Sequence, residues 1–253
     1  MNVSRVLRAD GVLVLTLDEP ERRNPLGLAV RQALAAHLAE AEADDAVHAV
    51  VLTGAGGHFS AGGDIRDQTE RSIAAHRARM GQIRELIGRM VRYAKPLVAA
   101  VEGWAVGGGF ALALACPTVV AARDARFVAG FTKIGLIPDM GLLATLPARV
   151  GPGTARRILL GNAPLEAEQA HGLGIVDSVA DPGGAVETAA ALALEEASGA
   201  PLPRQFVLSY FASVVDAALD YEHGVQPILL NSADAAEGRA AFFEKRPARF
   251  KGR

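Results

Sequence analysis

Residues 95–123 read "KPLVAAVEGWAVGGGFALALACPTVVAAR", and the alternation of runs in this stretch decides the fold class. The run at 96–103 predicts a buried strand, the glycine-opened run at 107–116 predicts a buried helix, and the run at 118–123 predicts a second strand. Strands that alternate with helices pair in parallel, because each helix carries the chain back along the sheet. The stretch therefore predicts an α/β fold.

The rest of the chain continues this pattern. Asp10-Gly11 separates two β-rich runs and predicts a hairpin. Apolar spacing then predicts helices at 27–43 and about 70–93 and strands at 47–53 and 174–179. Arginines, Arg79 among them, fall on the polar face of the second helix. Helices dominate after Pro152, so we divide the chain into a core, residues 1–200, and a helical C-terminal region, residues 201–253.

Composition narrows the class of protein. Half of the 253 residues are hydrophobic, which suits a large α/β core, and the net charge of −2 argues against a nucleic-acid-binding protein. A single cysteine fits a reducing compartment, and no metal-ligand spacing is present in the sequence. The first residues lack the form of a signal peptide, and no stretch approaches the roughly 20 apolar residues of a membrane helix. We expect a cytoplasmic protein that binds neither nucleic acid nor membranes.

Two glycine-rich stretches follow predicted strands. They are "GAGGHFSAGGDI" at 54–65 and "GWAVGGGFALA" at 103–113. Glycines that open a helix expose free backbone N–H groups at its positive end, so two such loops can aim donors at one developing oxyanion. The dinucleotide fingerprint is not met, because its third glycine position holds Phe59. Close packing of a helix on a strand remains the alternative use of these glycines.

Several motifs taken together resemble one family. "HFSAGGDI" at 58–65 is followed by the stretch at 95–116, while "DEPERRNPL" at 18–26, "LLGNAPLEAEQAHGLGIVDSV" at 159–179 and the tail "AAFFEKRPARFKGR" at 240–253 complete the set. The chain resembles the crotonase superfamily of enoyl-CoA hydratases and isomerases along nearly its whole length. The resemblance implies a spiral of ββα units followed by a helical region for trimerisation, assembled as a homotrimer or as a hexamer, a dimer of trimers.

The resemblance also implies an acyl-CoA thioester as substrate, with coenzyme A entering as part of it and no separate cofactor. Two backbone N–H groups, which the motifs place at Ala61 and Gly108, polarise the thioester carbonyl and stabilise an enolate. The implied substrate-binding and CoA-binding residues are Arg22, Arg23, Leu26, Ala61, Gly62, Gly63, Asp64, Ile65, Gly108, Phe242 and Lys245. For the two arginines, solvated loop charges are an equal alternative, and Phe242 also fits an ordinary core position.

The catalytic positions of the hydratases are occupied differently here. The resemblance places the two hydratase glutamates at Ala111 and Phe131, and neither side chain can move a proton. Asp139, in the apolar stretch "IGLIPDMGLL", aligns with a catalytic aspartate of family isomerases. The chain is most similar to the branch of enoyl-CoA isomerases and ring-1,2-epoxyphenylacetyl-CoA isomerase. An acid in an apolar setting indicates a functional site, although Asp139 could instead cap the following helix.

We therefore expect an acyl-CoA isomerase in which Asp139 moves a proton between two carbons of an enoyl- or ring-acyl-CoA. An enoyl-CoA hydratase-like hydro-lyase or a hydrolase that uses Glu102 or an unrecognised acid is one alternative. For Glu102 itself, a structural role at a strand end is favoured. A catalytically silent acyl-CoA-binding protein is the other alternative. Trp104, the only tryptophan, fits either the acyl pocket or the core.

Overall fold

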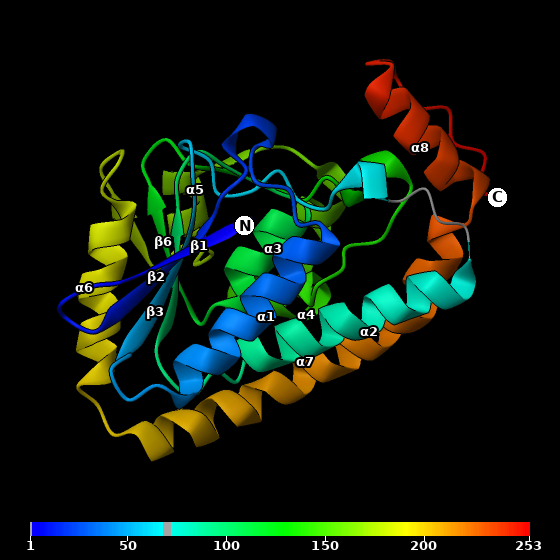
Figure 1. The fold of residues 1–253 in the computed structure, drawn as a ribbon. Coiled ribbons are helices and arrows are strands. Elements are labelled where there is room, and N and C mark those ends of the chain that lie inside the picture. Colours follow the sequence, from blue (N-terminus) through cyan, green and yellow to red (C-terminus); the bar gives the residue numbers. More distant parts are fainter. Residues whose placement is uncertain (1, 68–71) are drawn as a thin grey trace.

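The computed structural model describes residues 2–67 and 72–253 and arranges them around two β-sheets (Figure 1). The larger sheet has the order β1-β2-β3-β4-β6-β9. Its strands are β1 (Val3–Leu7), β2 (Val12–Leu17), β3 (Ala49–Gly54), β4 (Leu97–Val101), β6 (Thr118–Ala122) and β9 (Ser178–Ala180). β1 and β2 pair antiparallel with Val6 opposite Val14, which confirms the hairpin, and the remaining neighbours pair in parallel. The α/β class is thus confirmed.

The smaller sheet lies beside the glycine-rich loops. It joins β5 (Trp104–Val106) in parallel to β7 (Arg126–Val128), which pairs antiparallel with β8 (Leu165–Glu166). An isolated bridge between Ser60 and Ala105 fastens the first glycine-rich loop to the edge of this sheet. The sequence did not predict this sheet, because strands of two or three residues are too short to show a periodic pattern.

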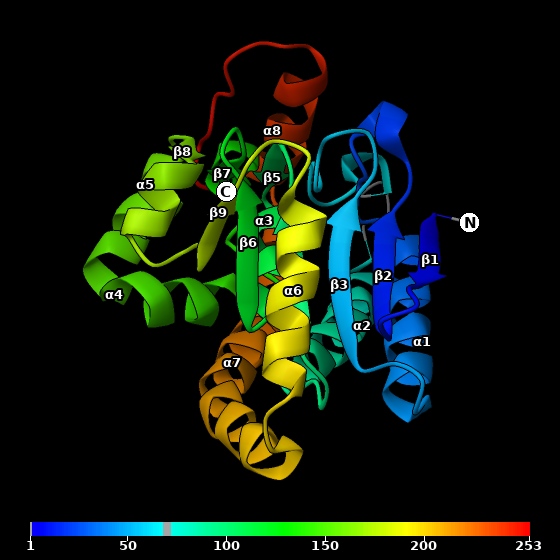
Figure 2. The same ribbon diagram turned by 90° about the vertical axis from the view of Figure 1, so that its left-hand side faces the viewer.

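Helices cover both faces of the larger sheet. Figure 2 shows α6 (Ala185–Ala197) lying across one face. Its buried residues are alanines, including Ala189 and Ala193, and they pack on valines of the sheet such as Val51 and Val98. The other face carries α1 (Leu28–Ala43), α2 (Ile73–Met90) and α3 (Gly108–Ala115). Every residue of α3 is buried, as its unbroken apolar sequence predicts.

The predicted second helix begins later than expected. Ser72 precedes α2, and its hydroxyl oxygen accepts a hydrogen bond of 3.3 Å from the N–H of Ala75. Such a cap satisfies one of the free N–H groups at a helix start, so α2 begins at Ile73. Residues 70–71, which the prediction also included, lie outside the described residues.

The second half of the chain is mostly helical, as predicted. α4 (Leu142–Gly161) changes direction at Gly151, whose φ is 75°, and short α5 (Ala167–Gly172) follows β8. α7 (Pro201–Leu230) runs beside α2, and α8 (Ala233–Phe243) projects beyond its end (Figure 1). Val215, Leu219 and Leu230 of α7 belong to the main hydrophobic core. α7 is therefore an integral layer of the core, while the domain boundary at residue 200 stays a prediction.

No helix among the described residues is long and apolar enough to cross a membrane.

Candidate active site

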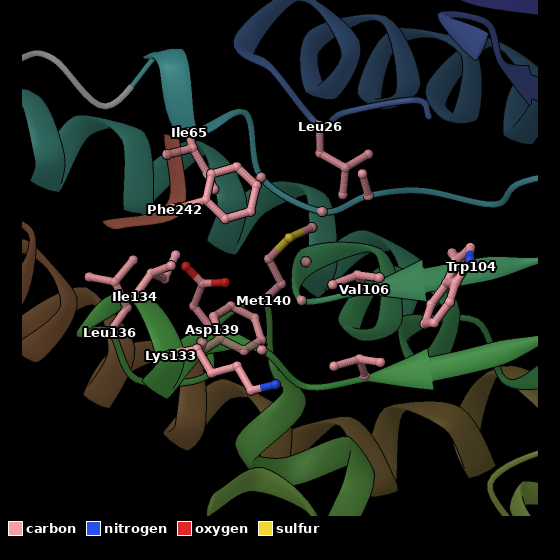
Figure 3. Close-up of a pocket in the computed structure, with 18 of the residues that line it drawn as sticks. Leu26, Ile65, Trp104, Val106, Lys133, Ile134, Leu136, Asp139, Met140 and Phe242 are labelled. Carbon is pink, nitrogen blue, oxygen red and sulfur yellow. The ribbon is translucent and has the colours of Figure 1, made fainter. Parts of the chain in front are cut away.

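A cavity of about 490 Å³ opens between the two glycine-rich loops, the turn before α4 and the end of α8. Most of its lining is apolar. Figure 3 shows Leu26, Val106, Met140, Ile134, Leu136 and Phe242 around it. Asp139 is the only acidic residue among the described residues that line this cavity. Its carboxylate points into the space between Ile134 and Met140 (Figure 3). The arrangement suits an apolar ligand with one polar reacting centre.

The first glycine-rich loop is held by side chains rather than by regular structure. The amide of Asn24, a buried residue, donates hydrogen bonds to the carbonyls of Ala55 and His58 at 2.9 and 2.7 Å. The hydroxyl of Ser60 donates to the carbonyl of Asn24 at 2.7 Å and accepts from the N–H of Gly62 at 3.1 Å. These bonds fix the backbone of this loop beside the start of α3.

The two glycine-rich loops approach closely because Gly109 has no side chain. A methyl group at Gly109 would lie 2.6 Å from the carbonyl oxygen of Ser60, which is too close for any real contact. One residue earlier, Gly108 opens α3, so its N–H has no partner within the helix. A methyl group at Gly108 would lie 3.4 Å from the backbone nitrogen of Gly63. The N–H groups of Gly63 and Gly108 therefore lie near each other at the cavity wall.

The prediction of Ala61 as the first oxyanion donor is wrong. The N–H of Ala61 donates to the carbonyl of Arg23 at 2.7 Å, so it is already engaged within the protein. The N–H of Gly63 makes no hydrogen bond within the described part of the chain. Within the described residues of the two loops, the N–H groups of Gly63 and Gly108 are the two placed to act as a donor pair. The motif identified the correct loop but not the residue within it, because the direction of each N–H depends on the turn.

Asp139 sits in a turn with unusual backbone geometry. The next two residues, Met140 and Gly141, have positive φ values of 57° and 78°, and Gly141 precedes α4 as its N-cap. The Asp139 carboxylate does not cap this helix. Its Oδ2 atom instead accepts a hydrogen bond of 3.0 Å from the amide of Gln226 on α7. Burial raises the pKa of Asp139, while Gln226 and the positive charges of Arg79 and Arg31 lower it. The helix-cap alternative is therefore excluded.

The positions equivalent to the hydratase glutamates are apolar in the structure as in the sequence. Ala111 is fully buried inside α3, and Phe131 packs at the cavity wall. Glu102, the alternative second acid, binds backbone groups outside the cavity. Its two carboxylate oxygens accept hydrogen bonds from the N–H groups of Gly183 and Ala185, at 3.2 and 3.1 Å, ahead of α6. Glu102 therefore caps a helix and does not face the cavity.

Most of the residues expected to bind CoA line the cavity. These are Arg23, Leu26, Ala61, Gly62, Gly63, Ile65, Gly108 and Phe242. Three others do not. Arg22 forms ion pairs with Asp64 and Glu19 at 2.6 and 2.7 Å, so it stabilises the loops around the site. Asp64 is buried in this pair, and Lys245 lies in the chain after α8. For Arg22, Asp64 and Lys245, a role in CoA binding stays a prediction.

Three basic residues at the cavity, Arg31, Arg79 and Lys133, were not recognised as site residues. Arg31 is buried on α1 and donates to the carbonyl of Leu26 at 2.6 Å, and Arg79 comes from α2. Helical spacing placed Arg79 on a polar face of α2. Arg84 and Arg89 of that face are exposed, whereas Arg79 borders the cavity. Trp104 also lines the cavity, with the guanidinium of Arg126 over its ring at 5.4 Å. The described residues contain no group of three potential metal ligands.

Comparisons with known proteins agree with this geometry. Residues 8–253 match the family described as enoyl-CoA hydratase/isomerase. The chain is 38% identical over 251 residues to the 1,2-epoxyphenylacetyl-CoA isomerase of Escherichia coli K12, covering 96% of each chain. It is 34% identical over 253 residues to the 2,3-dehydroadipyl-CoA hydratase of the same organism, covering 98% of each.

Solved structures show the same fold. A crystal structure of an enoyl-CoA hydratase from Mycobacterium avium subsp. paratuberculosis K-10 has a TM-score of 0.88 and 30% identity, covering 99% of both chains. An enoyl-CoA hydratase/isomerase from Pseudoalteromonas atlantica T6c also has a TM-score of 0.88, with 32% identity, covering 99% of this chain and all of the other. The match extends through the glycine-rich loops, the turn at Asp139 and both C-terminal helices. The chain belongs to the enoyl-CoA hydratase/isomerase family, within the crotonase superfamily.

Proposed function

We propose that this protein is an acyl-CoA isomerase that moves a proton, and with it a double bond, in an enoyl- or ring-acyl-CoA. The observation that carries the proposal is the single carboxylate of Asp139 in the cavity, together with apolar side chains at both hydratase glutamate positions. Moving a proton between two carbons needs one group that accepts and returns it. Adding water needs one group to activate the water and another to supply a proton.

The glycine-rich loops supply the electrostatic part of the mechanism. The thioester oxygen of the substrate accepts hydrogen bonds from the N–H groups of Gly63 and Gly108, and the positive end of α3 lies behind them. Charge that develops on this oxygen is stabilised, so a carbon-bound proton becomes more acidic. A missing donor of this kind typically costs about 10²–10³ in rate.

Asp139 supplies the proton transfer. The carboxylate removes a proton from one carbon and returns it to a carbon two positions away, because both carbons lie on the same face of the conjugated dienolate. Burial raises the pKa of Asp139 and thereby makes its carboxylate a stronger base toward a carbon acid. Coenzyme A is part of the substrate in this scheme, and no separate cofactor takes part.

The choice of isomerase over hydratase rests on particular residues. Relatives in the family bear both names, an isomerase and a hydratase among them. The hydratase alternative used Glu102 or an unrecognised acid. Both oxygens of Glu102 bind backbone N–H groups at the start of α6, and Asp139 is the only acid among the described residues that line the cavity. The apolar cavity and the ring-containing substrate in the name of the E. coli isomerase favour an enoyl or ring acyl group.

We also propose that the protein assembles in the cytoplasm as a homotrimer or as a hexamer made of two trimers. α7 carries a row of exposed apolar side chains, Phe206, Tyr210, Phe211 and Val214, each between 61% and 77% exposed. A monomer rarely leaves such a row in contact with water, since burying it against another subunit is favourable.

A substrate screen in ordinary water tests the proposed reaction. Acyl-CoA esters with β,γ or α,β double bonds, or with unsaturated rings, are incubated with the enzyme and analysed by mass spectrometry and NMR. We expect a product of unchanged elemental composition with a displaced double bond. A product heavier by one water indicates a hydratase, and tight binding of esters without any turnover indicates the silent binding protein. Either result overturns the proposal.

A further inference from the structure

A second carboxyl group lies behind the turn that carries Asp139. Glu222, in the C-terminal third of α7, is fully buried and does not line the cavity. Its two carboxyl oxygens accept the N–H of Gly141 at 3.2 and 3.1 Å. Glu222 makes no ion pair within the described part of the chain. A buried acid without a cationic partner is costly when ionised, so its place beside a catalytic turn needs an explanation.

α7 presents two polar side chains to this turn, four residues apart on one helix face. Gln226, also buried, uses its whole amide. The Nε2 atom donates to the carbonyl of Ile137 at 3.1 Å and to Asp139, while Oε1 accepts the N–H of Ile137 at 3.3 Å. Glu222 binds the other end of the turn, at Gly141. The turn from Ile137 to Gly141, including the positive φ of Met140, is therefore fastened to α7 at both ends.

The charged groups that act on the two carboxyl groups come from several elements. Asp139 is the only charged side chain that interacts electrostatically with Glu222 among the described residues. Arg31 from α1 and Arg79 from α2 attract Asp139. Lys133 lines the cavity together with Asp139. Where α2 meets α7, His76 is buried on α2, Arg84 and Asp220 form an ion pair, and Glu85, Asp216 and His223 lie beside that pair. The buried residues of α4 are not titratable.

We propose that Glu222 is a positioning residue that shares one negative charge with Asp139: at neutral pH Glu222 holds a proton, Asp139 is the carboxylate, and the protonation of Glu222 sets the basicity of Asp139. The inference rests on the proposed function, in which Asp139 is the base. Two neighbouring carboxyl groups in a buried site do not both ionise readily, because their charges repel.

The electrostatics of Glu222 fit this role. Burial and the negative charge of Asp139 raise the pKa of Glu222 to about 8, against the lowering effect of the N–H groups of Gly141 and Met140. When Glu222 loses its proton, a second negative charge appears beside Asp139 and increases its affinity for a proton. Proton removal from the substrate by Asp139 then becomes more favourable. We expect kcat to rise severalfold as the pH passes through about 8.

Glu222→Gln tests the inference, because glutamine keeps the size and an acceptor for Gly141 but cannot titrate. We expect the wild-type kcat to rise between pH 7 and 9 and the variant to show no such rise, so that their ratio is severalfold larger at pH 9. A purely structural role would lower kcat by the same factor at every pH. Equal pH profiles for the two proteins would overturn the inference.

Infrared spectroscopy provides a readout that does not depend on activity. The C=O stretch of a protonated carboxyl group should persist at pH 7 in the wild type, titrate with a midpoint near 8 and disappear in Glu222→Gln. In Asp139→Asn, removal of the neighbouring charge should move this midpoint to lower pH. An absent band, or an unmoved midpoint, contradicts the shared charge.

The two proposals fail separately in these experiments. If no acyl-CoA ester is isomerised but the midpoint still moves in Asp139→Asn, the function is wrong and the shared charge stands. If isomerisation is seen without the shared carboxyl band, the function stands and the role of Glu222 is wrong. If Glu222→Gln fails to fold, the infrared titration of Glu222 in Asp139→Asn still tests whether the two carboxyl groups share one charge.

Discussion

Gln226 Nε2 donates a hydrogen bond of 3.0 Å to Asp139 Oδ2, although the two residues are 87 positions apart in the sequence. The bond engages one carboxylate oxygen and leaves Oδ1 without a partner in the described residues. Because the amide of Gln226 is itself held by Ile137, the direction of the Asp139 carboxylate is fixed before any substrate arrives. The proposed base is thus preorganised by a helix from the far end of the chain.

Asp139→Asn should abolish most isomerisation without loss of CoA-ester binding. Asparagine keeps the size of the side chain and an oxygen for Gln226 but has no basic carboxylate. We expect kcat to fall by about 10²–10⁴ if Asp139 is the sole general base, with the Kd for an unreactive CoA ester unchanged. Calorimetric titration and steady-state kinetics measure the two effects. Full activity in Asp139→Asn would show that the base lies elsewhere.

Short enoyl-CoA esters should be hydrated poorly. Ala111 and Phe131 occupy the positions where hydratases of the superfamily carry glutamates, and Glu102 is engaged at the start of α6. Asp139 is then the only acid among the described residues that line the cavity, so a second acid to activate water or to protonate the neighbouring carbon is missing there. The loss of crotonyl-CoA absorbance measures hydration directly. Turnover comparable with that of an efficient hydratase would contradict the assignment.

Gly108→Ala should reduce activity while leaving the fold intact. The added methyl group would lie 3.0 Å from Sδ of Met140 and 3.4 Å from the backbone nitrogen of Gly63, in the space where the thioester oxygen is expected. We expect a loss in kcat/KM on the order of 10². Gly153→Ala is the matched control, because nothing lies within 4 Å of the position of its methyl group. Equal kinetics for both variants would show that Gly108 does not contact the thioester oxygen.

The free energy of unfolding should depend on pH through Glu222. Its pKa is about 8 in the folded protein against about 4.5 when exposed, so the folded state binds more protons between these values. The stabilising contribution is full below pH 4.5 and is lost as the pH rises toward 8. Urea unfolding at constant protein concentration measures the loss, on the order of a few kcal/mol. In Glu222→Gln, the free energy of unfolding should decrease less over this pH range. If it decreases as much as in the wild type, other groups than Glu222 cause the pH dependence.

Exposed apolar residues on α7 should hold the assembly together. We expect light scattering at micromolar concentration to give a mass three or six times the 26.3 kDa of the chain. Phe206→Ser combined with Tyr210→Ser should shift the population toward monomer. Both side chains are largely exposed in the single chain, so we expect the double variant to fold normally. Val6→Ser, at an exposed position on β1, is the control. A monomeric wild type would refute the proposed assembly.

The main elements of the fold could be predicted from the sequence because their apolar patterns are long. The hairpin at Asp10-Gly11, the buried helix α3 and the parallel strands around it all carry patterns of five or more residues. The smaller sheet could not be found, since its strands span two or three residues and are held by neighbours distant in the chain. Packing, rather than local preference, decides such short strands.

The site was partly predictable for a similar reason. Asp139 was recognisable because an acid within a long apolar run is unusual, and the glycines marked the two loops. Glu222 gave no such signal, because it stands among other polar residues in "ALDYEHGVQ", and only the packing of α7 brings it to the turn. The choice between Ala61 and Gly63 as donor likewise depends on the direction of each N–H, which no sequence pattern states.

The positive φ of Met140 has a consequence for protein engineering. Met140 adopts a backbone conformation that glycine adopts at little cost, yet its side chain forms part of the cavity wall beside Gly108. Shortening this side chain would widen the acyl site, and a glycine there would also relieve the backbone. Cavity size and turn strain would therefore change together at this position, which makes residue 140 a natural first target for directed evolution toward bulkier acyl groups.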